Sequence, residues 1–209
     1  MSEWIDLTVK LDDSYLPYPG DEGLKIWKTK DIRDDGYNMN QLSLNMHLGT
    51  HIDFKSHVFD YKARVTDFTR FIGKANVIKP FIHNGVVDTL DLTSKLEKMK
   101  YLEKILILDL SHARNLNKED YYSYPRFSKD IISVLKDYSI NVLGADIPSF
   151  DYQAEKSLQM HKDLLSNDIY VVENLVRVDE LKEHVFFIAL PLKIEGLEAS
   201  MTRAIARNL

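Results

Sequence analysis

Residues 47–57 read HLGTHIDFKSH, which places three imidazoles and a carboxylate within eleven residues. His47, His51 and Asp53 offer two nitrogen donors and one oxygen donor, a set that leaves coordination positions on a divalent ion open. Catalytic metals need such incomplete protein ligation, because water or substrate must occupy the remaining positions. We therefore interpret His47, His51 and Asp53 as ligands of a catalytic metal ion. The alternative is a polar strand face whose histidines only hydrogen-bond to their neighbours.

The backbone around these residues must bend for them to share one ion. Apolar and polar side chains alternate from residue 41 to residue 58, which is the period of an extended strand. In a straight strand, at about 3.3 Å per residue, His47 and His51 would lie roughly 13 Å apart. Gly49 lies between them and tolerates the backbone of a tight turn or bulge, so we predict a bend there. The apolar set expected in the core is Leu42, Leu44, Met46, Leu48, Ile52 and Phe54.

Two further residues with metal-binding chemistry lie on apolar faces farther along the chain. Glu173 shares an expected strand face with Val171, and His161 lies in an expected helix beside Leu165. A buried carboxylate must be neutral, ion-paired or bound to a metal, because unpaired burial of its charge is costly. The histidine is either a core residue with satisfied hydrogen bonds or a ligand. The residues alone leave both readings open.

The elements that must position these side chains indicate an α/β domain with a mixed sheet. Two short apolar runs flank a segment of helical spacing that begins behind Ser128, which is a pattern typical of a βαβ unit with a serine cap. Residues 17–21 carry turn chemistry and predict a loop. Strands are expected at 4–9, 104–110, 140–146, 169–175 and 185–192, and helices at 128–138 and 157–165.

The composition limits the possible partners. The chain has 209 residues without a linker-like tract, so we expect a single domain spanning 1–209. A formal charge of −5 gives no basic field for nucleic acid, and no apolar segment is long enough to cross a bilayer. The absence of cysteine excludes thiolate ligands, so any metal is held by His, Asp or Glu. No signal peptide is evident at the N-terminus, and we expect a cytoplasmic protein.

The chain resembles the cyclase family, which includes bacterial kynurenine formamidases and isatin hydrolases. Residues 47–57 fit its signature H-x-G-T-H-x-D-x-P-x-H, except that Lys55 replaces the proline. Lys55 shares the parity of the ligands, and it either meets an anionic substrate or is solvated. Met201 is a second departure, at a position where the family usually has proline. Further matches are YPGD (18–21), DGYN (35–38), RFIG (70–73), GADIPS (144–149), LPL (190–192), Gly196 and Arg203.

The resemblance implies a swivelling β/β/α fold with a mixed central sheet flanked by helices. It also implies one metal on His47, His51 and Asp53. Where a second metal is bound, its ligands are Asp53, His161 and Glu173, and Asp53 bridges the two ions. The twelve-residue spacing of His161 and Glu173 is the spacing found in the formamidases. The catalytic acid/base implied by the resemblance is His57.

The expected activity is hydrolysis of an amide or ester carbonyl in a small-molecule substrate of the arylformamide, cyclic amide or lactone type. A divalent ion, zinc or manganese with one or two per subunit, lowers the pKa of bound water to about 7, so the expected nucleophile is metal-bound hydroxide. The resemblance also implies a homo-oligomer, a dimer or tetramer. The alternatives are a metal-dependent cyclase or isomerase acting on a carbonyl, and a metal-binding or ligand-binding protein without catalysis.

Overall fold

The computed structural model describes residues 3–12, 14–60, 67–152 and 156–209. Its main sheet has eight strands and is mixed, as the sequence predicts. The strands are β1 (Ile5–Asp6), β4 (His51–Asp53), β5 (Ile72–Ile78), β8 (Ile105–Leu108), β9 (Val142–Ala145), β10 (Tyr170–Glu173), β11 (His184–Pro191) and β12 (Ala199–Asn208).

The sheet closes on itself instead of remaining open between layers of helices. Its order is β1-β12-β11-β5-β8-β9-β10-β4, and the N-terminal part of β12 also pairs with β4. Strands β5, β8, β9 and β10 run parallel, whereas the β12 and β4 contacts are antiparallel. The predicted α/β class is therefore confirmed, and the sheet is barrel-like. The sequence predicts strands β8 to β11 but gives no sign of β5 or β12.

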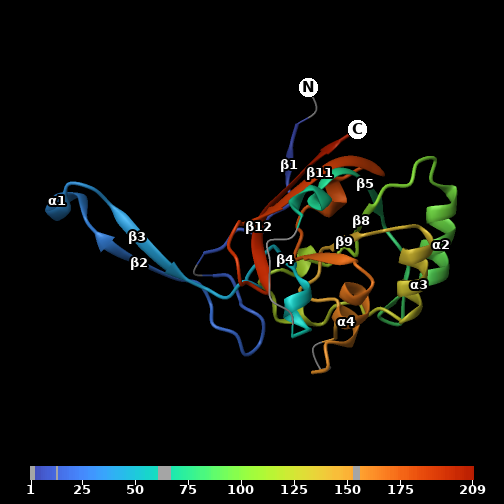
Figure 1. The fold of residues 1–209 in the computed structure, drawn as a ribbon, viewed down its shortest axis with the longest axis horizontal. Coiled ribbons are helices and arrows are strands. Elements are labelled where there is room, and N and C mark those ends of the chain that lie inside the picture. Colours follow the sequence, from blue (N-terminus) through green and yellow to red (C-terminus); the bar gives the residue numbers. More distant parts are fainter. Residues whose placement is uncertain (1–2, 13, 61–66, 153–155) are drawn as a thin grey trace.

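Three helices cover the outside of the sheet (Figure 1). They are α2 (Thr89–Lys98), α3 (Asp130–Asp137) and α4 (Gln159–Ser166). Helix α3 connects β8 to the parallel strand β9, so the predicted βαβ unit is confirmed. The predicted cap at Ser128 is wrong: the N-cap of α3 is Lys129, and Ser128 contributes only its backbone carbonyl, which accepts from the N–H of Ile131.

Alternate side chains of the parallel strands enter two separate cores. In β8, Ile105 and Ile107 pack inside the closed sheet, whereas Leu106 and Leu108 pack against the helices. This explains why the strand reads as an uninterrupted apolar run, since both of its faces are buried. Among the described residues, none of the helices combines the length and apolar character that a membrane crossing requires.

A two-stranded arm projects from the body of the molecule (Figure 1). Strands β2 (Lys25–Lys30) and β3 (Met39–Ser43) form it, with the short helix α1 (Ile32–Asp35) at its tip. The expectation of one extended segment from residue 41 to residue 58 is therefore wrong. Strand β3 ends at Ser43 and β4 begins only at His51. Leu42, expected in the core, is 61% exposed because the arm has no second layer to bury it.

The remaining short elements connect the main strands. Leu48, Ile52 and Phe54 are buried as predicted, whereas Leu44 and Met46 are half-buried at the root of the arm. The strand expected at 4–9 is regular only in β1. The short elements are β6 (Ile82–His83), β7 (Val86–Val87) and the 3₁₀ helices η1 (Lys55–His57), η2 (Phe68–Phe71), η3 (Ala113–Asn115), η4 (Glu119–Tyr122) and η5 (Val178–Glu180).

Candidate metal centre

Strands β4 and β10 present three polar side chains to one side of the sheet. In β4, Ile52 packs inside the closed sheet, so its neighbours His51 and Asp53 point to the opposite face. Strand β10 is antiparallel to β4 and places Glu173 directly opposite His51. Side chains directly opposite in adjacent strands share a face, so Glu173 lies beside the β4 pair. Its carboxylate Oε2 is 3.3 Å from Nε2 of His51.

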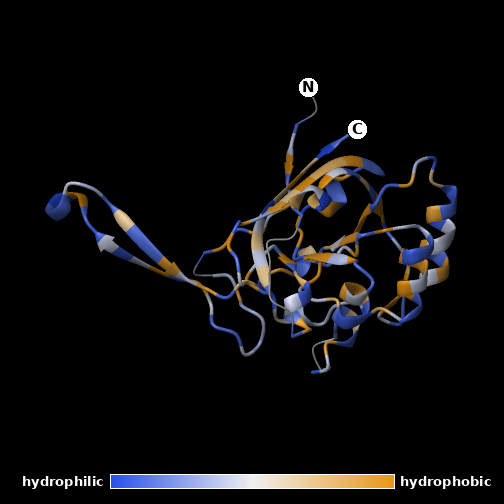
Figure 2. Cartoon of the chain, in the orientation of Figure 1, coloured by the Kyte–Doolittle hydropathy of each residue, from blue (hydrophilic) through white to orange (hydrophobic). Residues whose placement is uncertain are grey.

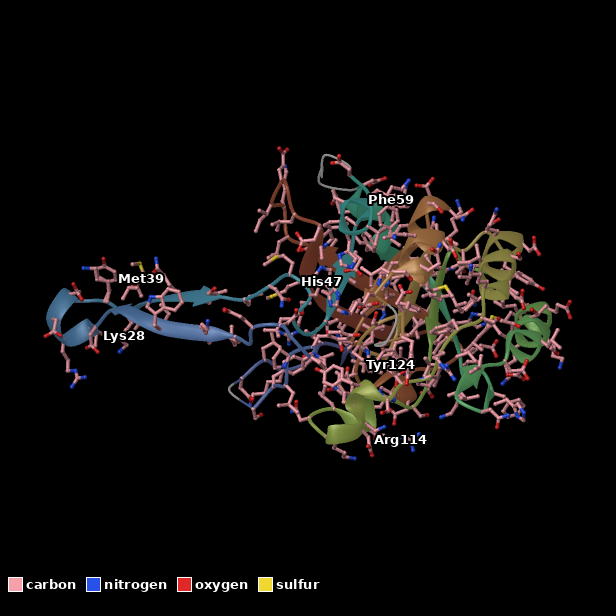
Figure 3. All side chains as sticks on the ribbon, turned by 90° about the horizontal axis from the view of Figure 1, so that it is seen from below. Lys28, Met39, His47, Phe59, Arg114 and Tyr124 are labelled. Atoms are coloured by element: carbon pink, nitrogen blue, oxygen red, sulfur yellow. The ribbon has the colours of Figure 1, made fainter. Side chains whose placement is uncertain are left out.

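A turn at Gly49 adds His47 to this group. Gly49 has φ = 70°, in the left-handed region that favours glycine, and a Cβ there would lie 2.8 Å from a methyl carbon of Leu11. The predicted bend is thereby confirmed. It brings Nδ1 of His47 within 3.2 Å of Nε2 of His51 and within 3.1 Å of Oδ1 of Asp53. In Figure 3, His47 lies where the arm joins the body.

Helix α4 supplies the third imidazole from outside the sheet. Nε2 of His161 lies 3.0 Å from Oδ2 of Asp53 and 3.0 Å from Oε1 of Glu173. Its neighbours Leu164 and Leu165 are fully buried and hold the helix against the strands. The two residues that the sequence left open between core and ligand roles therefore face the same point as His47, His51 and Asp53.

Asp53 is the centre of this arrangement and carries its clearest chemical signal. Both of its oxygens are buried and accept no hydrogen bond, although imidazole nitrogens lie 3.0 to 3.2 Å from them. Buried carboxylates are normally hydrogen-bonded, paired with a charge or bound to a metal. Nitrogen and oxygen lone pairs that converge without hydrogen-bond geometry fit a divalent cation. The residues present therefore fit a metal centre.

The electrostatics of the centre are those of a cation site. Burial alone would lower the pKa of His51, but the carboxylates of Asp53 and Glu173 outweigh it and raise the pKa to about 10. The pKa of His161 is also raised well above its usual value, because Glu173, Asp151 and Asp53 overcome the effect of burial. The paired imidazoles in turn keep the pKa of Asp53 well below its usual range despite burial. Two buried negative charges thus demand positive charge, as protons or as a metal.

His57 lies at the edge of the same cluster. Its ring centroid is 4.3 Å from that of His47 and 5.4 Å from that of His161. Burial lowers its pKa below the ordinary histidine value, so the neutral imidazole is favoured at neutral pH. Its ring also approaches the donor atoms of His47 and Asp53 closely enough to share a cation with them. The structure thus brings together all six predicted site residues: His47, His51, Asp53, His57, His161 and Glu173.

A cavity of about 230 Å³ opens onto this cluster. Tyr15, Tyr18 and Tyr122 line it together with Leu48 and Leu158. Nothing in the sequence indicates that these tyrosines line the cavity, since Tyr15 and Tyr18 precede the histidine motif in a loop and Tyr122 comes from η4, although Tyr18 belongs to the YPGD match. A cavity of this size, with apolar and phenolic walls, suits a small molecule.

The two residues that depart from the family pattern, Lys55 and Met201, are not among the candidate metal ligands. The ammonium group of Lys55 is 2.6 Å from a carboxylate oxygen of Asp168, in the turn before β10. This ion pair supports neither of the two roles considered for it, substrate binding or simple solvation. Met201 lies in β12 directly opposite His51 of β4.

The comparisons with known proteins agree with this fold. The Cyclase family model matches residues 5–152, and the chain therefore belongs to the Cyclase family. A kynurenine formamidase of Bacillus thuringiensis (strain Al Hakam) is 29% identical over 216 aligned residues, which cover 100% of this chain and 99% of the relative. The resemblance seen in the sequence is thereby confirmed.

Solved structures show the same fold at lower sequence identity. A potential metal-dependent hydrolase with cyclase activity superposes with a TM-score of 0.82 at 18% identity, covering 100% of this chain and 99% of the other. An isatin hydrolase bound to the product analogue thioisatinate superposes with a TM-score of 0.79 at 22% identity, covering 98% and 91%.

Proposed function

We propose that this protein is a metal-dependent hydrolase that cleaves an amide-type carbon–nitrogen bond in a small arylformamide or cyclic amide, with lactones as related substrates. The observation that carries the proposal is the pair of buried Asp53 oxygens, which accept no hydrogen bond among three imidazoles. Relatives named kynurenine formamidase, aligned over the whole chain, support the reaction class.

We assign the cation to His47, His51 and Asp53, with a second cation, where present, on Asp53, His161 and Glu173. Imidazole and carboxylate donors suit zinc or manganese. A divalent ion held there activates water and polarises a carbonyl oxygen. The carboxylate of Asp53 faces the two groups of nitrogens with different oxygens, Oδ1 toward His47 and His51 and Oδ2 toward His161. This division of the two oxygens supports a bridging role.

We assign the proton transfer to His57. Its neutral imidazole can accept a proton from the attacking water and then donate it to the leaving nitrogen, so that the amine leaves without a developing negative charge. Burial favours that neutral form. The phenols of Tyr15 and Tyr18 stand along the cavity where the aryl part of a substrate would lie. Burial raises the pKa of Tyr15 to about 12, so its hydroxyl remains a neutral hydrogen-bond donor at neutral pH.

Product analysis in ¹⁸O-labelled water tests the reaction class. The metal-loaded protein is incubated with a formanilide, a cyclic amide and a lactone, and the carboxylate product is examined by mass spectrometry. Hydrolysis inserts one solvent oxygen into that product, whereas a cyclase or isomerase leaves it unlabelled. A purified protein that binds zinc or manganese but converts none of these substrates would contradict the proposed activity.

We also propose that the chain assembles as a homo-oligomer through its arm. An isolated two-stranded ribbon is only marginally stable in water, and this one has no second layer. Its charged residues already pair within the arm, as in the contacts of Lys28 with Asp31 and Lys30 with Asp35, both 2.8 Å long. Its apolar residues remain exposed, and these are Ile26, Trp27, Ile32, Tyr37, Met39 and Leu42.

A second copy of the chain offers a surface that these residues can cover. Leu190, near the end of β11, and Leu192 and Ile194, just after it, are exposed apolar residues of the body. Figure 2 shows hydrophobic residues on the arm as well as on the body. Reciprocal packing of the arm of each subunit on the body of another would bury both groups, as a two-fold interface requires. Trp27 and Tyr37 belong to this exposed group on the arm and would be covered in the assembly.

A further inference from the structure

Asp151 contacts the candidate metal centre without facing the shared point. Its Oδ2 lies 2.6 Å from Nδ1 of His161, on the side of the ring opposite to Asp53 and Glu173. The side chains of Asp151 and His161 are both almost completely buried. An ionised carboxylate can accept hydrogen bonds but cannot donate one. The proton of this hydrogen bond therefore lies on Nδ1 of His161.

The same carboxylate also begins helix α4. The N-cap residue, Leu158, has a left-handed backbone with φ = 49° and makes no capping hydrogen bond with its side chain. Asp151 takes over this task from outside the helix, because Oδ1 accepts from the N–H of Met160 at 2.8 Å and Oδ2 accepts from the N–H of His161 at 2.9 Å. The backbone and the ring of His161 are thus held by one side chain.

The segment around Asp151 is itself anchored to the centre. The N–H of Phe150 donates to Oε1 of Glu173 at 3.0 Å, and the hydroxyl of Tyr124 donates to the carbonyl of Asp151. Two consecutive residues therefore contact both His161 and Glu173, one through a carboxylate and the other through a backbone N–H. Such contacts fix the orientation of both side chains relative to each other.

His47 and His51 have weaker partners than His161 at the ring nitrogen that faces away from the shared point. Nδ1 of His51 donates to the neutral carbonyl of Gly49 at 2.8 Å. Nε2 of His47 lies 3.6 Å from a carboxylate oxygen of Glu198, which is 42% exposed. Hydrogen bonds to a buried carboxylate are stronger than those to a neutral carbonyl or to a solvated group. His161 therefore depends most on its outer partner.

We propose that Asp151 is a positioning residue that holds His161 in the Nδ1–H tautomer, so that Nε2 is free to bind a divalent cation together with Asp53 and Glu173. This inference rests on the metal dependence proposed above. It concerns cation binding and not the reaction, so the two can fail separately. Carboxylate partners of metal-binding histidines commonly change metal affinity by about 10–100-fold.

The test measures cation affinity directly in matched variants. Metal-free wild type, Asp151→Ala and Asp163→Ala are titrated with zinc in the presence of a competing chelator. Asp163 lies on the same helix, where its carboxylate accepts from the side chain of Gln159 at 2.8 Å, outside the centre. We expect Asp151→Ala to weaken binding at the His161 side by about 10–100-fold and Asp163→Ala to leave it unchanged. Equal affinities in all three proteins would overturn the proposal.

Nitrogen NMR of the metal-loaded wild type gives a second measurement that needs no variant to fold. With ¹⁵N-labelled histidine, the expected spectrum shows His161 protonated at Nδ1 and without a proton at Nε2. A proton on Nε2 would overturn the proposal. In Asp151→Ala at limiting zinc, His161 should lose the signal of a zinc-bound Nε2 before His51 does, because His51 keeps its carbonyl partner. A general loss of structure would instead alter both rings.

These measurements separate the two claims. If Asp151→Ala binds zinc more weakly than the wild type but the wild type hydrolyses none of the substrates, the proposed activity fails and the role of Asp151 stands. If the wild type binds no divalent cation, both are wrong.

Discussion

At the scale of single residues, the histidines of the centre differ in pKa because their surroundings differ. His51 and His161 are almost completely buried between carboxylates, and their raised pKa values show how strongly the site attracts positive charge. His57 lies beside them, and burial lowers its pKa despite the nearby charge of Asp53. Histidine is thus a candidate ligand at two positions and a candidate proton carrier at a third.

Removal of His57 should separate catalysis from metal binding. We expect His57→Ala to lose about 10²–10⁴-fold in kcat while retaining its metal, because general acid/base catalysis contributes factors of this size. Asp53→Ala should lose the metal as well. Turnover of a formanilide and metal content by plasma emission spectroscopy provide the measurements. His83→Ala removes an exposed imidazole on β6 and is the matched control. Metal loss in His57→Ala would instead indicate a ligand role.

Metal affinity should decrease as the pH falls. The raised pKa values of His51 and His161 mean that both rings hold protons in the metal-free protein at neutral pH. A cation must displace those protons, so lower pH favours the protonated, metal-free form. Calorimetric titration at about pH 6 and about pH 8, in buffers of different ionisation enthalpy, should show weaker binding at the lower pH and release of about two protons. An affinity independent of pH would contradict the proposed donor set.

At the scale of elements, the site depends on one turn between two short strands. The left-handed backbone at Gly49 reverses the chain after the arm, and the fully buried Ile52 then orients β4 so that its ligands face α4. Strand β10 supplies Glu173 in register opposite His51. No single element holds the centre, because its donors come from a turn, two strands and a helix.

Substitution of Gly49 should damage both stability and metal binding. In Gly49→Ala the left-handed backbone costs about 1–2 kcal/mol, and the new Cβ meets Leu11 at 2.8 Å. We expect a lower free energy of unfolding in urea and weaker zinc binding, since His47 and His51 would separate. The double variant Leu11→Ala/Gly49→Ala removes the contact but not the backbone strain, so it should recover only part of the loss. Full recovery would show that the backbone conformation is unimportant.

At the scale of the whole molecule, the closed sheet and the arm differ in how much of their surface is buried. The closed sheet buries β8, β9 and β10 on both faces, and β12 completes it by pairing with β4. The arm buries almost none of its residues. Figure 3 places Lys28 and Met39 on this arm, away from the body, with His47 at its root. Because the arm emerges beside the cavity, the proposed assembly would connect the subunit contact to the site.

Polar substitutions on the arm should dissociate the oligomer without unfolding the subunit. We expect the triple variant Ile26→Ser/Trp27→Ser/Leu42→Ser to change from an oligomer to a monomer in light scattering coupled to gel filtration, because it removes three of the six exposed apolar groups of the arm. Tyr101→Ser on the body, exposed to 58%, is the control and should leave the mass unchanged. A wild type that is already monomeric at micromolar concentration would contradict the assembly proposal.

The sequence by itself determined the local chemistry of this protein. The donor types from His47 to His57, the glycine between the first two histidines and the apolar runs of the βαβ unit are short-range patterns, and their structural consequences are visible within a few residues. The spacing of His161 and Glu173 became meaningful only through the family resemblance. Periodicity misled where the alternating segment entered the arm, because alternation indicates an extended chain but not what covers it.

Only the tertiary structure decided which of these groups meet. The pairing of β12 with β4, the position of Asp151 behind His161 and the three tyrosines along the cavity all depend on contacts between distant segments. Such contacts leave no periodic trace in the chain, since each depends on how several elements pack at once. Spacing can nominate a ligand, whereas the convergence of lone pairs on one point is a property of the folded molecule.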